Sequence, residues 1–294
     1  MKILVIYGGF GLSPEAEISK NSGLAVLNAC KKAGYEAEGF ELNKDNIDYI
    51  INKAESFDLV APMLHGKFGE DGHIQKILED ADIPFIGSGS VSSQLCFNKV
   101  LTKIIFDDKG ILTPKWKIIQ KIDGLAGWNC PLVIKPIEGG SSIGVVIAKS
   151  QDDLTKVDFS SQILVEEYIK GQELTVGILG DVALSVVEII PPENRWFDYE
   201  VKYNNATQEN IPPKYISAEI QKQARALALK VHNLCGCRHL SRVDMILRDN
   251  QLFVLEINTL PGMTQESIYP KSAKAIGLEM PELVKQLIEL VVEW

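Results

Sequence analysis

Acidic and amide side chains recur near the C-terminus at a spacing suited to metal and phosphate chemistry. Their segment reads Arg242-Val-Asp-Met-Ile-Leu-Arg-Asp-Asn-Gln-Leu-Phe-Val-Leu-Glu-Ile-Asn258, and two apolar runs around a polar turn predict a β-hairpin. A three-residue loop at 249–251 places Asp244 opposite Glu256, with Asn258 on the same face because side chains alternate along a strand. Two carboxylates and an amide oxygen are hard ligands, so this face predicts a site for Mg²⁺ that bridges phosphates.

The opposite face of this hairpin is wholly apolar and is predicted to belong to the core. It consists of Val243, Met245, Leu247, Phe253, Leu255 and Ile257. The acid face also carries Ile246 and Val254, which argues against an ordinary exposed surface, and buried acids require a compensating cation or donor. Arg242 shares that face, and Gly262 follows in the next loop. An arginine and a backbone N–H placed together could stabilise a developing oxyanion.

A glycine-rich loop gives a second signal for phosphate binding. It lies in Lys135-Pro-Ile-Glu-Gly-Gly-Ser-Ser-Ile-Gly144, where backbone N–H groups and two serine hydroxyls can cover phosphate oxygens. The loop runs into a strand at 145–148 and lacks the Gly-Lys-Ser/Thr of a Walker loop, so it has the character of a lid. An ordinary hairpin turn explains the glycines alone equally well. Lys135 and Lys99 could neutralise nucleotide phosphates, although a lone lysine is more often a surface residue.

The elements that must hold these residues begin with an alternation of strands and helices. We expect strands at Ile3–Tyr7, Glu36–Leu42 and Asp58–Leu64, helices at Glu17–Lys32, Asp45–Ala54 and Gly72–Glu79, and a short apolar run at Pro84–Gly87. This alternation predicts an α/β unit with a doubly wound parallel sheet, whose ligands bind at the carboxyl ends of the strands.

The remainder of the chain has a different texture and predicts two α+β units. After a long helix at Ser90–Phe106 we expect β-type runs at Trp116–Ile119, Leu132–Lys135, Val145–Ala148, Ile163–Tyr168 and Leu174–Leu179, then from about Ala183 further strands, a helix at Ala218–Leu234, the hairpin and a closing helix at Pro281–Val292. The expected units are residues 1–90, 91–182 and 183–294.

Composition excludes several classes of protein. The chain has 294 residues, 30 basic against 39 acidic, a formal net charge of −9 and 46% hydrophobic residues, as globular proteins do. The negative balance argues against a nucleic-acid partner. No apolar run reaches the roughly 18–20 residues that span a bilayer, and the first apolar run is too short for a secretory signal. We therefore expect a cytoplasmic protein without a membrane partner.

The cysteines fit the same compartment. There are five, an odd number that favours reduced thiols over a disulfide framework. His232, Cys235, Cys237 and His239 lie close together in the sequence, but Cys-x-Cys is tighter than the usual spacing of structural zinc ligands. A zinc site is therefore the less favoured interpretation.

These segments occur together and in this order in the ATP-grasp D-alanine–D-alanine ligases, which the chain resembles over nearly its whole length. The matching segments are Gly8-Gly9, Ser13-Pro-Glu15-Ala-Glu-Ile-Ser-Lys-Asn-Ser-Gly23, His65-Gly-Lys-Phe-Gly-Glu70-Asp-Gly, Phe85-Ile-Gly87-Ser-Gly, Asn98-Lys99-Val-Leu-Thr-Lys103, Lys135-Pro with Gly140-Ser141-Ser-Ile-Gly144, Phe197-Asp-Tyr-Glu-Val-Lys202-Tyr203, Arg242-Val-Asp244, and Glu256-Ile-Asn258-Thr-Leu-Pro-Gly262-Met-Thr with Ser267. The resemblance implies an ATP-grasp fold. It also implies that ATP drives the joining of two D-alanines, through an acyl phosphate, into the dipeptide of bacterial cell walls.

The resemblance further implies roles for individual residues in binding ATP and metal. The phosphates would be held by Lys99, Lys135 and the loop that contains Ser142 and Gly144, with Lys202 at the transferred phosphoryl group. The adenine and ribose would be bound by Glu166, Glu167, Ile169 and Glu173. Two Mg²⁺ or Mn²⁺ ions would be bound by Asp244, Glu256 and Asn258.

The amino-acid substrates have their own implied residues. Glu15 and His65 would bind the ammonium of the first D-alanine, with Ser141 and Tyr203 as hydrogen-bonded partners. The oxyanion would be met by Arg242 and Gly262, and the carboxylate of the second D-alanine by Ser267 and Ile268. The family implies a homodimer, and a requirement for a monovalent cation stays open.

Two departures and three alternatives accompany this interpretation. Ala16 stands where the family usually has arginine, and Asn98 where it usually has aspartate. A D-alanine–D-lactate ligase of the same fold is the nearest alternative, disfavoured by the pair Lys202-Tyr203. A nicotinamide-dependent oxidoreductase is suggested by Gly8-Gly9-Phe-Gly11, but the full Gly-x-Gly-x-x-Gly is missing. An inactive nucleotide sensor is the third, disfavoured because the expected phosphate and metal groups are present.

Overall fold

The N-terminal unit is a parallel three-stranded sheet covered by helices, as the alternation of elements predicts. The computed structural model describes residues 1–9, 14–192 and 207–293. The strands are β1 (Lys2–Gly8), β2 (Glu36–Leu42) and β3 (Leu59–Pro62), in the order β2-β1-β3. The helices are α1 (Pro14–Lys32), α2 (Ile50–Ala54) and α3 (His73–Asp80). The first strand is buried without interruption from Ile3 to Ile6, as a strand covered on both faces must be.

One expectation in this unit is corrected. The helix expected over Asp45–Ala54 is divided into a 3₁₀ turn at Ile47–Tyr49 and the short α2. The run at Pro84–Gly87 adds no full strand and contributes a single parallel bridge between Val60 and Phe85.

The long helix predicted at Ser90–Phe106 is wrong in one respect, because the helix breaks at Asn98. The chain forms α4 (Ser90–Phe97) and α5 (Lys99–Asp108) instead. Asn98 has extended backbone angles, φ −91° and ψ 103°, and its side chain accepts hydrogen bonds from the N–H groups of Val100 and Leu101. Asparagine is among the preferred N-cap residues, because its side chain satisfies N–H groups that a helix start leaves unpaired.

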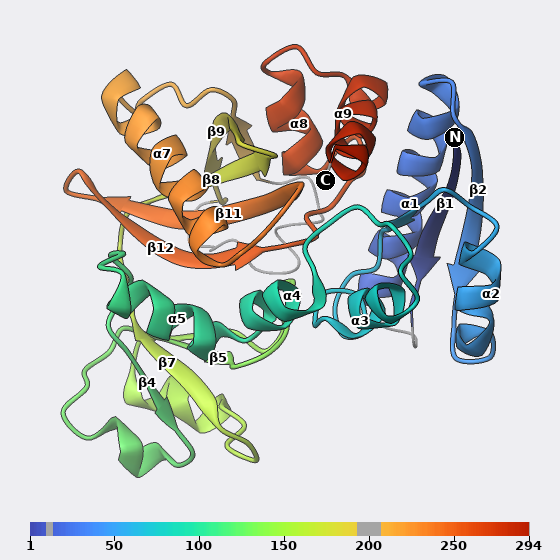
Figure 1. Cartoon of the computed structure of the whole chain (residues 1–294). Coiled ribbons are helices and arrows are strands. Elements are labelled where there is room, and N and C mark those ends of the chain that lie inside the picture. The colour runs from blue at the N-terminus through green and yellow to red at the C-terminus, as the bar shows by residue number, and fades with distance from the viewer. Residues whose placement is uncertain (10–13, 193–206, 294) are drawn as a thin grey trace.

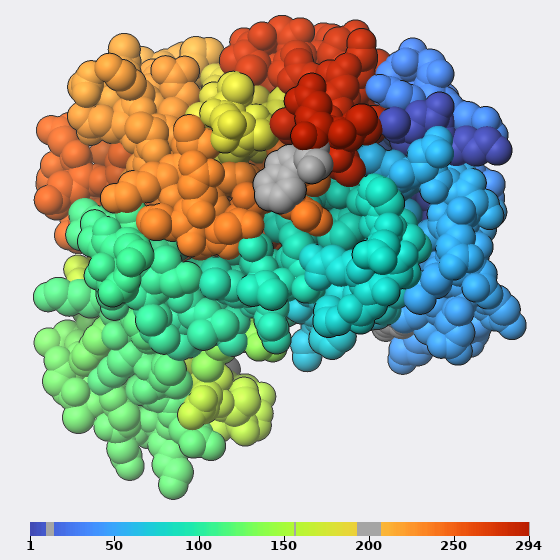
Figure 2. Space-filling model, in the orientation of Figure 1, coloured from blue at the N-terminus to red at the C-terminus, as the bar shows by residue number. Residues whose placement is uncertain are grey.

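The second unit is an antiparallel four-stranded sheet that projects as a separate lobe, green to yellow-green in Figure 2. Its strands are β4 (Trp116–Ile119), β5 (Leu132–Pro136), β6 (Val146–Ala148) and β7 (Ile163–Glu167), in the order β4-β7-β5-β6. Leu132, Ile134 and Val165 form its small apolar core with neighbours from the turns. The glycine-rich loop joins β5 to β6, so it lies between two strands as expected.

Within the described residues, the third unit is an antiparallel five-stranded sheet accompanied by three helices. Its strands are β8 (Gln172–Leu179), β9 (Val182–Ile190), β10 (Gln208–Asn210), β11 (Leu240–Arg248) and β12 (Gln251–Asn258), in the order β10-β9-β8-β11-β12. The helices are α7 (Ala218–Leu234), α8 (Ile268–Lys274) and α9 (Met280–Val292). The division expected between residues 182 and 183 therefore separates β8 from most of the sheet to which it is hydrogen-bonded.

The two ends of the chain share one core. Figure 1 shows α9, in red, beside the blue α1. Ile3 and Val26 of the first unit lie in the same apolar cluster as Leu283 and Leu287 of α9. Packing between the ends fixes the N-terminal unit against the five-stranded sheet, and thereby fixes the loops of both across from each other. Within the described ranges, no helix combines the length and apolar character that a membrane crossing requires.

The hairpin of β11 and β12 has the predicted pairing of Asp244 with Glu256, but it reaches this pairing through a different turn. The turn contains two residues, Asp249 and Asn250, both with positive φ, and Arg248 pairs with Gln251. A β-bulge between the pairs Met245–Val254 and Asp244–Glu256 then adds the residue that the turn lacks. The three-residue loop was wrong, yet Asp244 does lie opposite Glu256.

The bulge also exchanges the faces assigned to two apolar residues. Val254 is fully buried in the core cluster with Val243 and Met245, although it was expected on the acid face. Leu255 was expected in that core but lines a cavity together with Ile246. An extra residue in one strand shifts the alternation of side chains by one position, which accounts for both errors.

Candidate active site

Two cavities meet between the three units. One of about 770 Å³ lies between the N-terminal unit and the five-stranded sheet, and one of about 490 Å³ lies between the two antiparallel sheets. We call them the first and the second cavity. Both are lined by Lys99, Gly139, Gly140 and Glu256. A group bound in one cavity can therefore reach a group bound in the other at this shared wall.

The lysine side of the shared wall is provided by the start of α5 and the glycine loop. Lys99 is buried, and its Nζ donates to the Gly139 carbonyl at 2.6 Å. Burial lowers the pKa of Lys99, while the nearby Glu256 opposes that effect. The backbone of the loop turns sharply, with φ of 54° at Ser141, 58° at Ser142 and 75° at Gly144. A cation and a left-handed loop at one place are suited to phosphate oxygens.

A second lysine, Lys135, lies in the second cavity and is paired with Glu166. Lys135 Nζ lies 2.8 Å from Glu166 Oε2, and Lys103 Nζ lies 2.8 Å from Glu166 Oε1. Burial alone would raise the pKa of Glu166, but the two lysines overcome it and hold the pKa below its ordinary value. Glu166 is therefore an anion despite its complete burial, because each oxygen has its own cation.

The acid side of the shared wall is the hairpin of β11 and β12. Arg242 donates two parallel hydrogen bonds to Asp244, one from Nε to Oδ1 at 2.9 Å and one from a terminal nitrogen to Oδ2 at 2.7 Å. The Thr175 hydroxyl of β8 also donates to Asp244. Asn258 Oδ1 accepts from the N–H of Leu260 at 2.7 Å and so shapes the loop after the hairpin.

The oxygen donors of this face fit a divalent cation. Asp244 and Glu256 are cross-strand neighbours, and Asn258 ends the same strand as Glu256. In the part of the chain that the structure describes, no three His, Cys, Asp or Glu side chains gather to hold a metal by themselves, so an amide would have to complete the set. Carboxylate and amide oxygens are the donors that Mg²⁺ prefers.

The far wall of the first cavity comes from the N-terminal unit. Its lining includes His65 and Glu70, whereas Glu15, near the start of α1, lies just behind the lining: a Cβ on Gly66 would be 2.3 Å from Glu15 Oε2, and one on the lining Gly140 would be 3.3 Å from Oε1. Burial raises the pKa of Glu15, the neighbouring Glu70 raises it further, and Ser141 and His65 oppose them. Among the described residues, Glu15 Oε1 has no hydrogen-bond partner. A buried carboxylate of this kind is matched by an incoming cationic donor.

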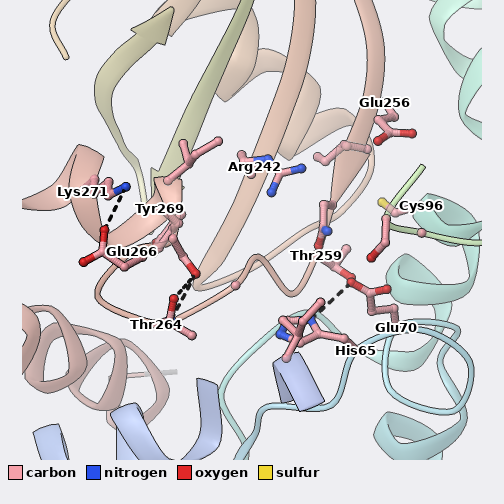
Figure 3. Close-up of a pocket in the computed structure, with 18 of the residues that line it drawn as sticks. His65, Glu70, Cys96, Arg242, Glu256, Thr259, Thr264, Glu266, Tyr269 and Lys271 are labelled. Carbon is pink, nitrogen blue, oxygen red and sulfur yellow. Dashed lines mark hydrogen bonds and ion pairs between the residues drawn. The ribbon is translucent and has the colours of Figure 1, made fainter. Parts of the chain in front are cut away.

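His65 links this wall to the loop after the hairpin. Its Nε2 lies 3.2 Å from Ser22 Oγ, which in turn accepts from the N–H of Met263. Its Nδ1 lies 3.8 Å from Glu70 Oε1. Figure 3 shows His65 and Glu70 together on one side of the cavity, with Arg242 on the wall above them.

The remaining wall of the first cavity is the loop before α8. Ser267 Oγ accepts from the N–H of Thr264 at 3.1 Å and contacts its hydroxyl at 2.8 Å. Gly262 lies so close that a Cβ would be 2.8 Å from Ser267 Oγ. Ile268 begins α8 and lines the cavity. The buried Tyr269 hydroxyl donates to the Ile178 carbonyl at 2.9 Å and fixes α8 to the sheet.

The other residues expected from the sequence are distributed as follows. Ser142, Glu167, Ile169 and Glu173 line the second cavity. Lys202 and Tyr203 lie outside the described residues. In the sequence cluster considered for zinc, His232 Nδ1 lies 2.7 Å from Ser241 Oγ, and His239 Nδ1 accepts from the N–H of Gly87.

Three residues of this site received no role from the sequence. Lys103 pairs with Glu166, Glu70 faces His65 and Glu15, and Thr175 supports Asp244. A signal existed for Lys103, because residues four apart share a face of a helix and Lys103 follows Lys99 by four positions. The alternation of residues along β8 gave no comparable signal for Thr175.

Comparisons with known proteins agree with this geometry. Family models described as "D-ala D-ala ligase C-terminus" and "D-ala D-ala ligase N-terminus" match residues 104–289 and 47–88. A D-alanine–D-alanine ligase of Clostridium perfringens is 37% identical over 299 residues, covering 98% of this chain and 97% of the relative. The structure is similar to a D-alanine–D-alanine ligase from Bacillus anthracis complexed with ATP, at 34% identity and a TM-score of 0.85, with 100% and 97% of the two chains covered. It is also similar to the VanG D-Ala:D-Ser ligase from Enterococcus faecalis, at 29% identity and a TM-score of 0.83, with 99% of each chain covered.

Proposed function

Because the chain belongs to the D-alanine–D-alanine ligase family, we propose that it joins two D-alanine molecules for cell-wall precursor synthesis, with ATP converted to ADP and phosphate. The observation that carries this proposal is the wall shared by the two cavities. Lys99 and the glycine loop line this wall together with Glu256. A phosphoryl group passed from a nucleotide in one cavity to a carboxylate in the other must cross this wall.

The second cavity is the nucleotide site in this proposal. Lys99 and Lys135 neutralise the phosphates, while Ser142 and Gly144 contribute the loop that covers them. Ile169 and Glu173 line the same cavity and are suited to the adenine and the ribose hydroxyls. Glu166 and Glu167 belong to the same segment. Lys202 is assigned to the transferred phosphoryl group from the sequence alone.

Asp244, Glu256 and Asn258 are the residues that would hold Mg²⁺ or Mn²⁺. Bound to these oxygens, such a cation would neutralise part of the charge of the nucleotide phosphates. Arg242 holds Asp244 in place from the same strand.

The first cavity binds the two amino acids. Glu15, with His65 beside it, takes the ammonium of the first D-alanine, and Ser141 completes its surroundings, while Tyr203 is assigned there from the sequence alone. Ser267 and Ile268 take the carboxylate of the second D-alanine. The carboxylate of the first D-alanine attacks the γ-phosphate, and ADP leaves. The amine of the second then attacks the acyl carbon, loses a proton and expels phosphate, with Arg242 and the Gly262 N–H placed to stabilise the oxyanion.

Three broader features complete the proposal. The substrate, lid and catalytic parts follow the expected division into residues 1–90, 91–182 and 183–294, except that β8 belongs to the catalytic sheet with which it pairs. The enzyme works as a homodimer in the cytoplasm, where ATP is available. Its partners are small molecules, and the net charge of −9 opposes binding to a nucleic-acid backbone.

The test is product analysis together with one matched pair of variants. With ATP, Mg²⁺ and D-alanine alone, the expected products are ADP, phosphate and D-alanyl-D-alanine. Addition of D-lactate or D-serine should leave the dipeptide as the main product. A predominant ester, or a predominant D-alanyl-D-serine, would assign the chain to another ligase of the same fold.

The variant pair tests the substrate residue. Glu15→Gln should lower the rate of D-alanine-dependent ADP release by at least about a hundredfold, because a missing charged partner costs about 3 kcal/mol or more. The control Glu17→Gln removes an exposed carboxylate from the same helix and should change the rate less than twofold. Equal rates for both variants would remove Glu15 from the site.

A further inference from the structure

Lys103 is a fully buried cation that touches the active site only through other residues. Its side chain is 0% exposed, and that of Glu166 is 1% exposed. Lys103 is absent from the described residues that line the two cavities, whereas Lys99, Lys135 and Glu166 are among them. Lys103 therefore has no direct access to a nucleotide. An enclosed lysine is costly to bury, so its position demands an explanation.

The contacts of Lys103 place it behind Glu166. Its ammonium lies 2.8 Å from Glu166 Oε1, on the side opposite to Lys135, which takes Oε2. It also donates to the Thr113 hydroxyl, which donates to the Val254 carbonyl of β12 at 2.7 Å. These bonds hold the Lys103 ammonium between the four-stranded sheet and the hairpin of β11 and β12. Burial lowers the pKa of Lys103 to about 8 against the opposing effect of Glu166, so the group is mostly cationic at neutral pH.

The charges of this trio have a simple consequence. A carboxylate paired with Lys135 alone would leave a neutral pair at the cavity wall, and a neutral pair attracts phosphate weakly. Two lysines on one carboxylate leave one net positive charge, and only Lys135 of the two lysines lines the cavity. In a buried region this charge is poorly screened by water.

We propose that Lys103 is a positioning residue. It neutralises the negative charge of Glu166 from the side away from the cavity, so that the positive charge of Lys135 stays available to the phosphates of the nucleotide. Glu166 then holds the Lys135 side chain in position but does not cancel its positive charge. The proposal rests on the assignment of the second cavity as the nucleotide site. It goes beyond that assignment because it gives a function to a lysine that does not touch the ligand.

The test is a set of charge variants measured with adenosine, AMP, ADP and ATP by isothermal calorimetry in the presence of Mg²⁺. The quantity of interest is the affinity for ATP divided by the affinity for adenosine, because it isolates the phosphates from the base. Lys103→Met leaves no net charge on the trio, the double variant Lys103→Met/Glu166→Gln restores one positive charge, and Glu166→Gln leaves two.

The expected ratios follow this charge order. Lys103→Met should lower the ratio at least about tenfold, which corresponds to about 1.4 kcal/mol. The double variant should return to within about threefold of wild type, and Glu166→Gln should equal or exceed wild type. Lys109→Met, which removes an exposed lysine just after the same helix, should leave the ratio unchanged.

Failure of this proposal can be distinguished from failure of the proposed function. If Lys103→Met weakens the binding of adenosine and of ATP equally, Lys103 only supports packing and the proposal is overturned. The proposal is also overturned if the double variant does not recover the wild-type affinity ratio. Should Lys103→Met fail to fold in thermal unfolding, the double variant and Glu166→Gln still test the charge order. If Lys135→Met leaves ATP affinity unchanged, the nucleotide site has been assigned wrongly, and that outcome rejects the proposed function of the cavity.

Discussion

Neutralising Asp244 should weaken the folded protein even before any ligand is added. Asp244 accepts two hydrogen bonds from Arg242 and one from Thr175. The Arg242 and Asp244 side chains are 17% and 12% exposed, so water replaces the lost partner only in part. Hydrogen bonds to a charged group each contribute about 1.5–3 kcal/mol, and an amide in place of the carboxylate keeps some of them. We expect Asp244→Asn to lower the free energy of unfolding by about 2 kcal/mol.

The assay is thermal unfolding in EDTA and again with Mg²⁺ and ADP. For a chain of 294 residues, 2 kcal/mol corresponds to a fall in Tm of about 3 °C, and the variant should also lose the stabilisation that Mg²⁺ with ADP gives to the wild type. Asp80→Asn is the matched control, because Asp80 pairs with Lys76 on an exposed helix surface, where such pairs contribute less than about 1 kcal/mol. An Asp244→Asn variant with unchanged Tm in EDTA would refute the role of the Arg242–Asp244 pair, and one still stabilised by Mg²⁺ would refute the metal assignment.

Two further predictions follow from buried groups. Burial and Glu70 raise the pKa of Glu15, so the folded state retains this proton at a pH where the unfolded chain has lost it, and the carboxylate disfavours folding above about pH 4. Glu15→Gln should therefore raise Tm at pH 8 but not at pH 4, although it removes ligase activity; an equal shift at both values would contradict the raised pKa. Tyr269→Phe deletes the bond to the Ile178 carbonyl and should lower the free energy of unfolding by about 1–2 kcal/mol and raise KM for D-alanine more than for ATP. In contrast, Phe in place of the exposed Tyr215 should leave both quantities unchanged.

Much of the fold was predictable because periodicity reports burial directly. The unbroken apolar run at the start of β1 predicted a buried parallel strand, and the helical spacing of Ala218–Leu234 matched α7 at both ends. The family and its ligase activity were also predictable, because many short motifs had to occur in one order. The proximity of Asp244 and Glu256 came from the alternation of side chains, and the structure has that pair.

The errors lie where a single residue changes the backbone without changing the apolar pattern. Asn98 stands in a segment with helical spacing on both sides, so only its capping geometry reveals the break. Leu255 is one leucine among apolar neighbours, and nothing in the sequence marks it as the bulged residue. Helix α8 was not expected, because it is short and contains Pro270. Proline is tolerated there because it occupies the first helical turn, where its missing N–H is not needed.

The helix break at Asn98, which the sequence pattern did not predict, also positions residues of the candidate active site. In one continuous helix the N–H of Lys99 would bond to a carbonyl of the preceding turn. In the broken helix that N–H bonds instead to the Ile137 carbonyl at 2.9 Å, and Asn98 forms a bridge with Glu138. The start of α5 is thereby tied to the strand that leads into the glycine loop. The same helix start places Lys99 at the shared wall and Lys103, four residues later, behind Glu166. The Ile137 hydrogen bond and the two ion pairs of Glu166 therefore hold Lys99, the glycine loop and the Lys103–Glu166–Lys135 trio in one arrangement, so the geometry of the charges proposed to bind the phosphates depends on the helix break that the sequence pattern concealed.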